Sequence, residues 1–292
     1  MRRVLIRGTL GLFLATAVVA VGLRWTRRLP PSRPAPDGYE QLVTLGQGVF
    51  DEDWRLSENG AARAVFGLRH PLLVQETREA LRHPMEAFPA TSDTELDKLR
   101  QVMALKRLGN SLGHLADNAA WTNDCRTALE IHLVRVELGL GAVRGGVLID
   151  FMVGTAIESG GLTGIARLTN CPGPIRAGPA LTALRRLLAT EEPMAAVLSR
   201  ERRWMWLESG WWRSAEQLRD HAADIFRNPR DHTRKREHLM ARQRRDALLV
   251  LARMAYTADH GVPPKRNEDL VPGYLAVVPA DPGPAPASAW PW

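Results

Sequence analysis

Apolar residues at helical spacing along residues 92–168 constrain the fold of this chain more than any other feature. The sequence SDTE at residues 92–95 has the pattern of a capping box, in which Ser92 caps a backbone amide and Glu95 reaches back to the cap. Apolar side chains then recur every three or four residues, at Leu96, Leu99, Val102, Met103, Leu105, Leu108, Leu112 and Leu115. This spacing predicts a long amphipathic helix.

Two further helices are predicted directly after this one. A turn at Asp117-Asn118 precedes a second helix over residues 120–138, with Trp121 in its apolar set. Glycines are expected to end that helix, at Gly139, Gly141, Gly145 and Gly146. A third helix begins near Val147, and Gly160-Gly161 is expected to kink or split it. Short turns between amphipathic helices favour antiparallel packing, so we expect helical hairpins that resemble a short repeat solenoid.

Most of the remaining chain is also predicted to be helical. The expected segments are residues 71–82, 179–189, 193–208, 214–226 and 231–259. In the first of them we expect Leu72, Leu73 and Leu81 to point inward. Strand patterns are almost absent, and residues 274–278 are the only extended candidate. The predicted fold class is therefore all-α, with little or no strand.

Residues 8–23 have the character of a membrane segment, because they are apolar throughout and bracketed by arginines. About twenty apolar residues cross a bilayer, and residues 4–6 lengthen the stretch if Arg7 extends back to the headgroups. A cleavable signal peptide and a buried soluble helix are the alternatives. The residues before Arg24 make a poor cleavage site, and Trp25 suits a membrane interface. We therefore expect a single-pass signal anchor at residues 1–23.

The orientation of this anchor is not settled by its flanking charges. Arginines lie on both sides of the apolar stretch, at Arg2, Arg3 and Arg7 before it and at Arg24, Arg27, Arg28 and Arg33 after it. The positive-inside rule leans slightly toward a cytoplasmic body, whereas the short N-terminal head is the usual layout of a signal anchor. We expect an extracytoplasmic, periplasmic body. The expected domains are a Pro-rich linker, a helical domain, a long helix with a C-terminal segment, and a Pro/Ala/Trp tail, at residues 24–38, 39–226, 227–282 and 283–292.

Two cysteines, Cys125 and Cys171, are the only ones in the chain. This number excludes a disulfide-rich scaffold and any cysteine-rich zinc module. In an oxidising compartment the two thiols could form a disulfide. Two separate buried thiols are the alternative.

A basic run within residues 227–245 is the strongest charge feature. Its members are Arg227, Arg230, Arg234, Lys235, Arg236, Arg242, Arg244 and Arg245. The run is interpreted as a solvated helix face, as a contact for anionic headgroups or an acidic partner, or as a nucleic-acid contact. Acidic residues interrupt it and no aromatic residues interleave for base stacking, so nucleic acid is the least favoured partner. The net charge of +7 comes almost entirely from arginine and is not by itself a sign of nucleic-acid binding.

Known catalytic motifs are absent from the sequence, including a P-loop, G-x-S-x-G and H-E-x-x-H. Acidic and histidine residues gather at His221, Asp224, His232, Glu237 and His238, but Glu237 and His238 are adjacent and point to different helix faces. We expect no metal site and no cofactor.

A pocket that gathers His114, Asp117, Asp124 or His132 would favour an enzyme. A tryptophan cluster is read as core or membrane interface rather than as a ligand site, at Trp204, Trp206, Trp211 and Trp212.

Three short motifs follow the last predicted helix: HGVPP at residues 260–264, DLVPGYL at 269–275 and VPADP at 278–282. This order resembles the C-terminal segment of type II secretion pseudopilins. The chain is similar over residues 117–139, 148–158 and 201–203 to uncharacterised membrane-anchored helical proteins of planctomycete-type bacteria that carry the same segment.

The resemblance implies a helical fold and an anchor, and no known activity. No acidic residue follows Gly8 where processed pseudopilins carry glutamate, and residues 283–292 stand where the similar proteins have a β-rich region. We expect a non-catalytic interaction or envelope-assembly module with a protein partner in the envelope. The alternatives are a hydrolase-like enzyme, or a basic helix that binds nucleic acid or anionic lipid.

Overall fold

The computed structural model describes residues 37–49, 60–87, 95–173, 175–203 and 229–283, all within one unit that spans residues 36–292. These residues form helices and connecting loops, and no strand occurs among them. The all-α fold class is therefore confirmed for the described part of the chain. The expected extended piece at residues 274–278 is a turn and bend instead.

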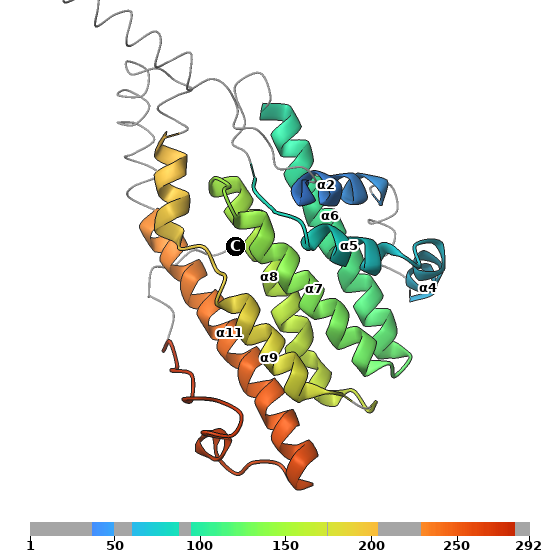
Figure 1. Cartoon of the computed structure of the whole chain (residues 1–292), viewed down its shortest axis with the longest axis vertical. Helices are drawn as coiled ribbons and strands as arrows, with labels where there is room; N and C mark the ends of the chain where they lie inside the picture. The colour runs from blue at the N-terminus through green and yellow to red at the C-terminus, as the bar shows by residue number, and fades with distance from the viewer. Residues whose placement is uncertain (1–36, 50–59, 88–94, 174, 204–228, 284–292) are drawn as a thin grey trace, which may run out of the picture. The chain divides into compact units, whose positions relative to one another are not determined.

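The helices follow one another in the order seen in Figure 1, from blue to red. They are α2 (Gly38–Gly48), α4 (Gly60–Arg69), α5 (Leu73–Leu81), α6 (Glu95–Trp121), α7 (Cys125–Val143), α8 (Leu148–Arg167), α9 (Ala177–Leu188) and α11 (Pro229–His260). Two short 3₁₀ helices follow α8 and α11, namely η2 (Leu168–Asn170) and η3 (Asn267–Leu270). Residues 194–203 are also helical.

Helix α7 packs against both α6 and α8, and these two helices also contact each other. A Cβ atom on Gly139 would lie 2.5 Å from the backbone nitrogen of Glu158, and one on Gly154 would lie 2.6 Å from the carbonyl oxygen of Gly139. Glycine at these positions lets the backbones of α7 and α8 approach closely. The expectation that Gly139 and Gly141 end the second helix is wrong, because α7 continues past them to Val143. Likewise, α8 is unbroken through Gly160-Gly161.

The turn between α6 and α7 lies at residues 122–124 and not at Asp117-Asn118. Asp124 caps α7 by accepting a hydrogen bond from the Thr127 amide at 3.1 Å, and Asn123 takes the left-handed conformation at φ 61°. Helix α6 therefore extends to Trp121, whose side chain is 87% exposed. Its assignment to a buried apolar set is wrong. Leu72 is also exposed, contrary to the expectation that it points inward. It lies just before the first residue of α5, whereas its neighbour Leu73 is buried inside the helix.

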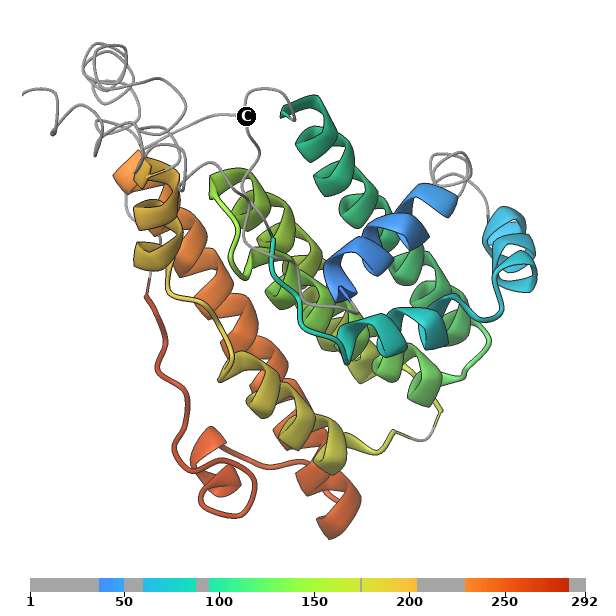
Figure 2. The ribbon, with the colours of Figure 1, turned by 45° about the horizontal axis from the view of Figure 1, so that its top comes forward.

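Three hydrophobic clusters hold these helices together, and the smallest consists of Val143, Phe151 and Val197. Of the two larger clusters, the first joins α2, α4, α5, α6, α7 and one residue of α8 around the fully buried Leu42, Leu105 and Leu108. The second joins α7, α8, α9 and α11, and it includes Leu270 and Leu275 of the C-terminal segment. Figure 2 shows α9 and α11 side by side, with the red C-terminal segment returning along α11. The long last helix and its C-terminal segment thus share a core with the preceding helices.

Several predicted features lie outside the described residues. These are the apolar stretch at residues 8–23, the linker up to residue 36, the start of the capping box, the helix at residues 214–226 and the tryptophan cluster. Within the described ranges, no helix combines the length and the apolar character that a membrane crossing requires.

Candidate functional site

A pocket of about 350 Å³ opens where α6, α7 and α8 meet the chain after η2. Its polar and aromatic lining comes from Asp117 and Trp121 at the end of α6, His132 of α7, Arg167 at the end of α8, and Asn170. Cys171 forms part of its wall. The size lies at the lower end of the range for small-molecule pockets.

His132 is the most deeply buried polar group in this pocket, at 3% exposed. Its Nδ1 atom makes no hydrogen bond to any described residue. Gly164 of α8 makes room for the ring, because a Cβ atom there would overlap the imidazole. Burial, together with the positive charges of Arg135 and Arg167, lowers the pKa of His132 to about 3. The imidazole is therefore neutral near pH 7 and offers one donor and one acceptor.

The other polar groups of the pocket are exposed to solvent. Arg167 and Asn170 are exposed, and neither makes a side-chain hydrogen bond or ion pair with another residue in the described part of the chain. Trp121 leaves most of its indole ring in solvent. The arrangement combines a flat apolar ring with donors and an acceptor, which is the chemistry of a binding site for a small polar molecule.

A disulfide between Cys125 and Cys171 lies beside this pocket. The two Cα atoms are 5.9 Å apart, within the normal range for such a bond. Cys125 is fully buried at the start of α7, and its Sγ accepts a hydrogen bond from the Gly173 amide at 3.0 Å. The bond therefore ties the start of α7 to the segment after η2 that forms one wall of the pocket.

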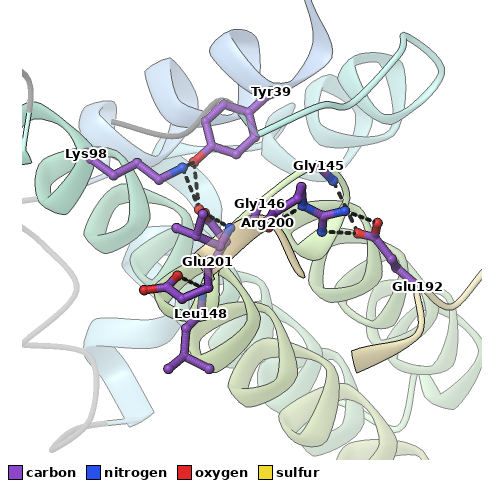
Figure 3. Close-up of polar contacts among 10 residues, drawn as sticks. Tyr39, Lys98, Gly145, Gly146, Leu148, Glu192, Arg200 and Glu201 are labelled. Atoms are coloured by element: carbon purple, nitrogen blue, oxygen red, sulfur yellow. Dashed lines mark hydrogen bonds and ion pairs between the residues drawn. The ribbon is translucent and has the colours of Figure 1, made fainter. Parts of the chain in front are cut away.

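A second polar cluster lies at the opposite end of α8 and is buried (Figure 3). Lys98 Nζ and Asp150 Oδ1 are 2.7 Å apart, with side chains 6% and 0% exposed. The Tyr39 hydroxyl donates to the same oxygen at 3.4 Å, and the Val147 amide donates to the other carboxylate oxygen at 2.9 Å. Both oxygens of Asp150 are therefore satisfied within the fold, as a buried carboxylate requires.

The loop between α7 and α8 is held by the helical residues 194–203 (Figure 3). Arg200 donates to the Gly146 carbonyl oxygen at 2.7 Å and forms a two-pronged ion pair with Glu192. Glu201 accepts a hydrogen bond from the Leu148 amide at 2.8 Å, at the first residue of α8. Burial raises the pKa of the Glu201 carboxyl. These contacts have a structural role, because each one fixes the loop or the start of α8.

The basic run on α11 is divided between internal contacts and solvent. Arg236 donates to Thr155 Oγ1 at 2.7 Å and to the Met152 carbonyl oxygen at 3.0 Å, both on α8. Arg245 donates to the Pro279 carbonyl oxygen at 3.2 Å in the C-terminal segment. These two side chains therefore pack α11 against its neighbours, which a uniformly solvated face would not do.

Arg244 makes the strongest of these internal contacts. Its guanidinium forms two hydrogen bonds, of 2.7 and 3.0 Å, with the buried carboxylate of Glu158 and a further ion pair with Glu191. Although burial alone would lower the pKa of Arg244, these two carboxylates raise it above its usual value. Lys235 and Arg242 make no side-chain hydrogen bond or ion pair with other described residues. Arg227 and the side chains of Arg230 and Arg234 lie outside the described part of the structure.

Of the residues expected to mark an enzyme, only Asp117 and His132 line the pocket. Asp124 serves as the cap of α7 instead. Sequence reasoning missed Arg167, Asn170 and Trp121, because no motif marks the first two and helical spacing assigned the third to the core. No group of three metal-binding side chains occurs within the described ranges. No protein-family model, curated protein or solved structure matches this chain.

Proposed function

We propose that this chain is a single-pass membrane protein whose helical body lies in the periplasm and serves as a non-catalytic interaction module of the bacterial envelope. The observation that carries the proposal is the disulfide between Cys125 and Cys171, the only two cysteines of the chain. Disulfides persist in oxidising compartments and are rare in the bacterial cytoplasm. The apolar stretch at residues 8–23 supplies the anchor in this proposal.

The chemistry of the described polar groups favours binding over catalysis. The buried charges of Asp150 and Glu158 are engaged by Lys98 and Arg244 in contacts between helices. A general acid or base works best with a pKa near the working pH, and the pKa of His132 is about 3. A hydrolase-like enzyme built on Asp117 and His132 is the alternative, because both line one pocket.

We also propose that residues 246–282 are related to the pseudopilin segment. The support is their order: the end of α11, a turn at Gly261 with φ 73°, and a return along the helix through η3. For an anionic partner, such as a headgroup or an acidic protein, Lys235 and Arg242 are the proposed contacts on α11. Nucleic acid is not proposed as a partner.

The location of the body can be tested by trapping thiols in intact cells that express the full chain. Cells are quenched with acid, the chain is denatured in the presence of an alkylating reagent so that buried free thiols are also blocked, and it is then isolated, reduced and labelled with a heavy maleimide. A periplasmic body gives a shift for both cysteines only after reduction. It is also digested by protease in spheroplasts, and it stays with the membrane after a carbonate wash.

A variant lacking residues 8–23 provides the matched control. Its body is expected to be released from the membrane and to remain in the cytoplasm with both thiols free. Determination of the N-terminal residue of the full chain separates a retained anchor from a cleaved signal peptide. Alkylation of both cysteines before reduction, together with protease resistance until the inner membrane is opened, would overturn the proposed location.

A further inference from the structure

The pocket beside the disulfide has features that the proposed envelope role does not explain. His132 is buried there with an unsatisfied Nδ1, and a buried polar atom without a partner has a free-energy cost. Gly164 leaves space for the ring, so the buried position of the imidazole is accommodated by the packing of α7 and α8. A ligand that reaches the imidazole would supply the missing hydrogen bond.

The charges of the lining limit the class of ligand. Asp117 contributes a negative charge, Arg167 contributes a positive one, and His132 is neutral. Each of these charges attracts ligands of opposite sign and repels those of its own sign, so the pair together favours neither a net anion nor a net cation. A neutral ligand suits the balance between them.

The hydrogen-bonding groups of the lining narrow the class further. The carboxylate accepts, the guanidinium donates, and the Asn170 amide and the imidazole each do both. Hydroxyl groups donate and accept, so a molecule rich in hydroxyls can form hydrogen bonds with all four side chains. Trp121 adds an indole ring that is 87% exposed, a flat apolar surface for a face of C–H bonds.

We propose that this pocket is a saccharide-binding site, in which a sugar ring stacks on Trp121 while its hydroxyls bond Asp117, His132, Arg167 and Asn170. A volume of about 350 Å³ has room for one or two sugar rings. A zwitterion such as a free aliphatic amino acid also matches one acid and one base. It has no flat face for the largely exposed indole, and it is the competing outcome of the test. The inference does not depend on the location of the body.

Ligand-observed saturation-transfer NMR on the full chain tests the proposal. The chain is held in an amine-oxide detergent, because a detergent with a sugar headgroup would compete for the pocket. The probes are glucose, galactose, mannose, N-acetylglucosamine and cellobiose, with glutamine and leucine as the amino-acid probes. We expect saturation to reach the ring C–H protons of at least one saccharide.

Variants then connect that binding to the pocket. Trp121→Ala removes an exposed ring and is expected to weaken saccharide binding by at least about tenfold, as large aromatic contacts do. Asn170→Ala is expected to weaken it by a smaller factor. Leu68→Ala, at a side chain 81% exposed on α4 and absent from the lining, is the matched control and keeps full affinity.

Each remaining outcome would overturn the proposal. The absence of binding by all five saccharides excludes the class at millimolar concentration. Saccharide binding that survives Trp121→Ala at full affinity places the sugar elsewhere. Binding of the amino acids in preference to the saccharides assigns the pocket to a zwitterion. Circular dichroism of each variant confirms that the fold is retained before its binding is compared.

Discussion

The two ends of α8 solve the problem of buried polar groups in opposite ways. At its start, Asp150 is fully buried, yet Lys98, Tyr39 and the Val147 amide satisfy both of its oxygens. At its other end, His132 of α7 is buried against α8 with its Nδ1 unsatisfied, next to a pocket. We call these the closed end and the open end of α8.

The difference separates a structural cluster from a binding site without reference to any motif. A closed cluster contributes to stability only while it is complete, since removing one partner leaves the other buried and uncompensated. An open cluster retains an unsatisfied group that a ligand can engage. The predictions below test this comparison, from the largest expected effect to the smallest.

The closed end is tested by Lys98→Met. The substitution leaves the carboxylate of Asp150 buried without its cation, so we expect the free energy of unfolding to fall by about 3–5 kcal/mol. Urea unfolding of the full chain, followed by circular dichroism, measures this loss. Arg100→Met is the matched control, because the ion pair of Arg100 with Asp97 is exposed and is worth less than about 1 kcal/mol.

A double variant sharpens the same test. Lys98→Met combined with Asp150→Asn removes the buried charge as well as its partner, so part of the lost stability should return. A Lys98→Met variant as stable as the wild type would show that the ion pair between Lys98 and Asp150 does not stabilise the fold in solution.

The open end depends on the disulfide for one of its walls. Replacing both cysteines, as Cys125→Ala with Cys171→Ala, removes a link across 46 residues and should lower the free energy of unfolding by about 3 kcal/mol. Saccharide affinity should fall as well, because Cys171 lines the pocket. Reduction of the wild type by dithiothreitol serves as the control and should reproduce both effects. Unchanged stability after reduction would contradict the role of the bond.

The closed and open ends also differ in how far the sequence predicts them. Helical spacing predicts the main helices and the fold class, because periodicity is local. It misplaces the turn before α7, because Asp117-Asn118 and Asp124 offer similar capping chemistry and the structure places the cap at Asp124. The sequence predicts that Gly139 ends α7, yet close contact with α8 uses this glycine inside the helix.

The sequence reveals no residue of the closed end as part of a cluster, and it reveals the open end only in part. Lys98 and Asp150 are 52 positions apart in the numbering, and no local pattern marks a pair that only the fold brings together. Arg244 belongs to a basic run whose composition favours a solvated face, whereas the fold directs it to Glu158. Asp117 and His132 were recognised as candidates by chemistry alone, and the fold adds Arg167 and Asn170.

The pH dependence of stability tests the open end further. The folded pKa of His132 is about 3, below its ordinary value of 6.5, so between these values the unfolded chain binds a proton that the folded chain does not. Stability should therefore fall as pH falls through this window, by about 2 kcal/mol between pH 7 and pH 5. His132→Gln should flatten the slope in urea unfolding, whereas His83→Gln, at a half-buried histidine outside the pocket, should leave it unchanged.

Glu201 at the closed end should give the smallest effect, and one of opposite sign. Burial raises its pKa, so just above the ordinary carboxyl range the folded chain holds a proton that the unfolded chain has lost. Its contribution is complete below the unfolded pKa and is lost as pH rises through the folded pKa. Because the side chain is partly exposed, we expect the free energy of unfolding to change by less than about 1 kcal/mol.

Glu201→Gln keeps the acceptor for the Leu148 amide and should remove this slope, whereas Glu79→Gln, at an exposed carboxylate on α5, should not. Urea unfolding at several pH values measures both slopes, and a Glu201 slope with the same sign as that of His132 would erase the electrostatic distinction between the two ends.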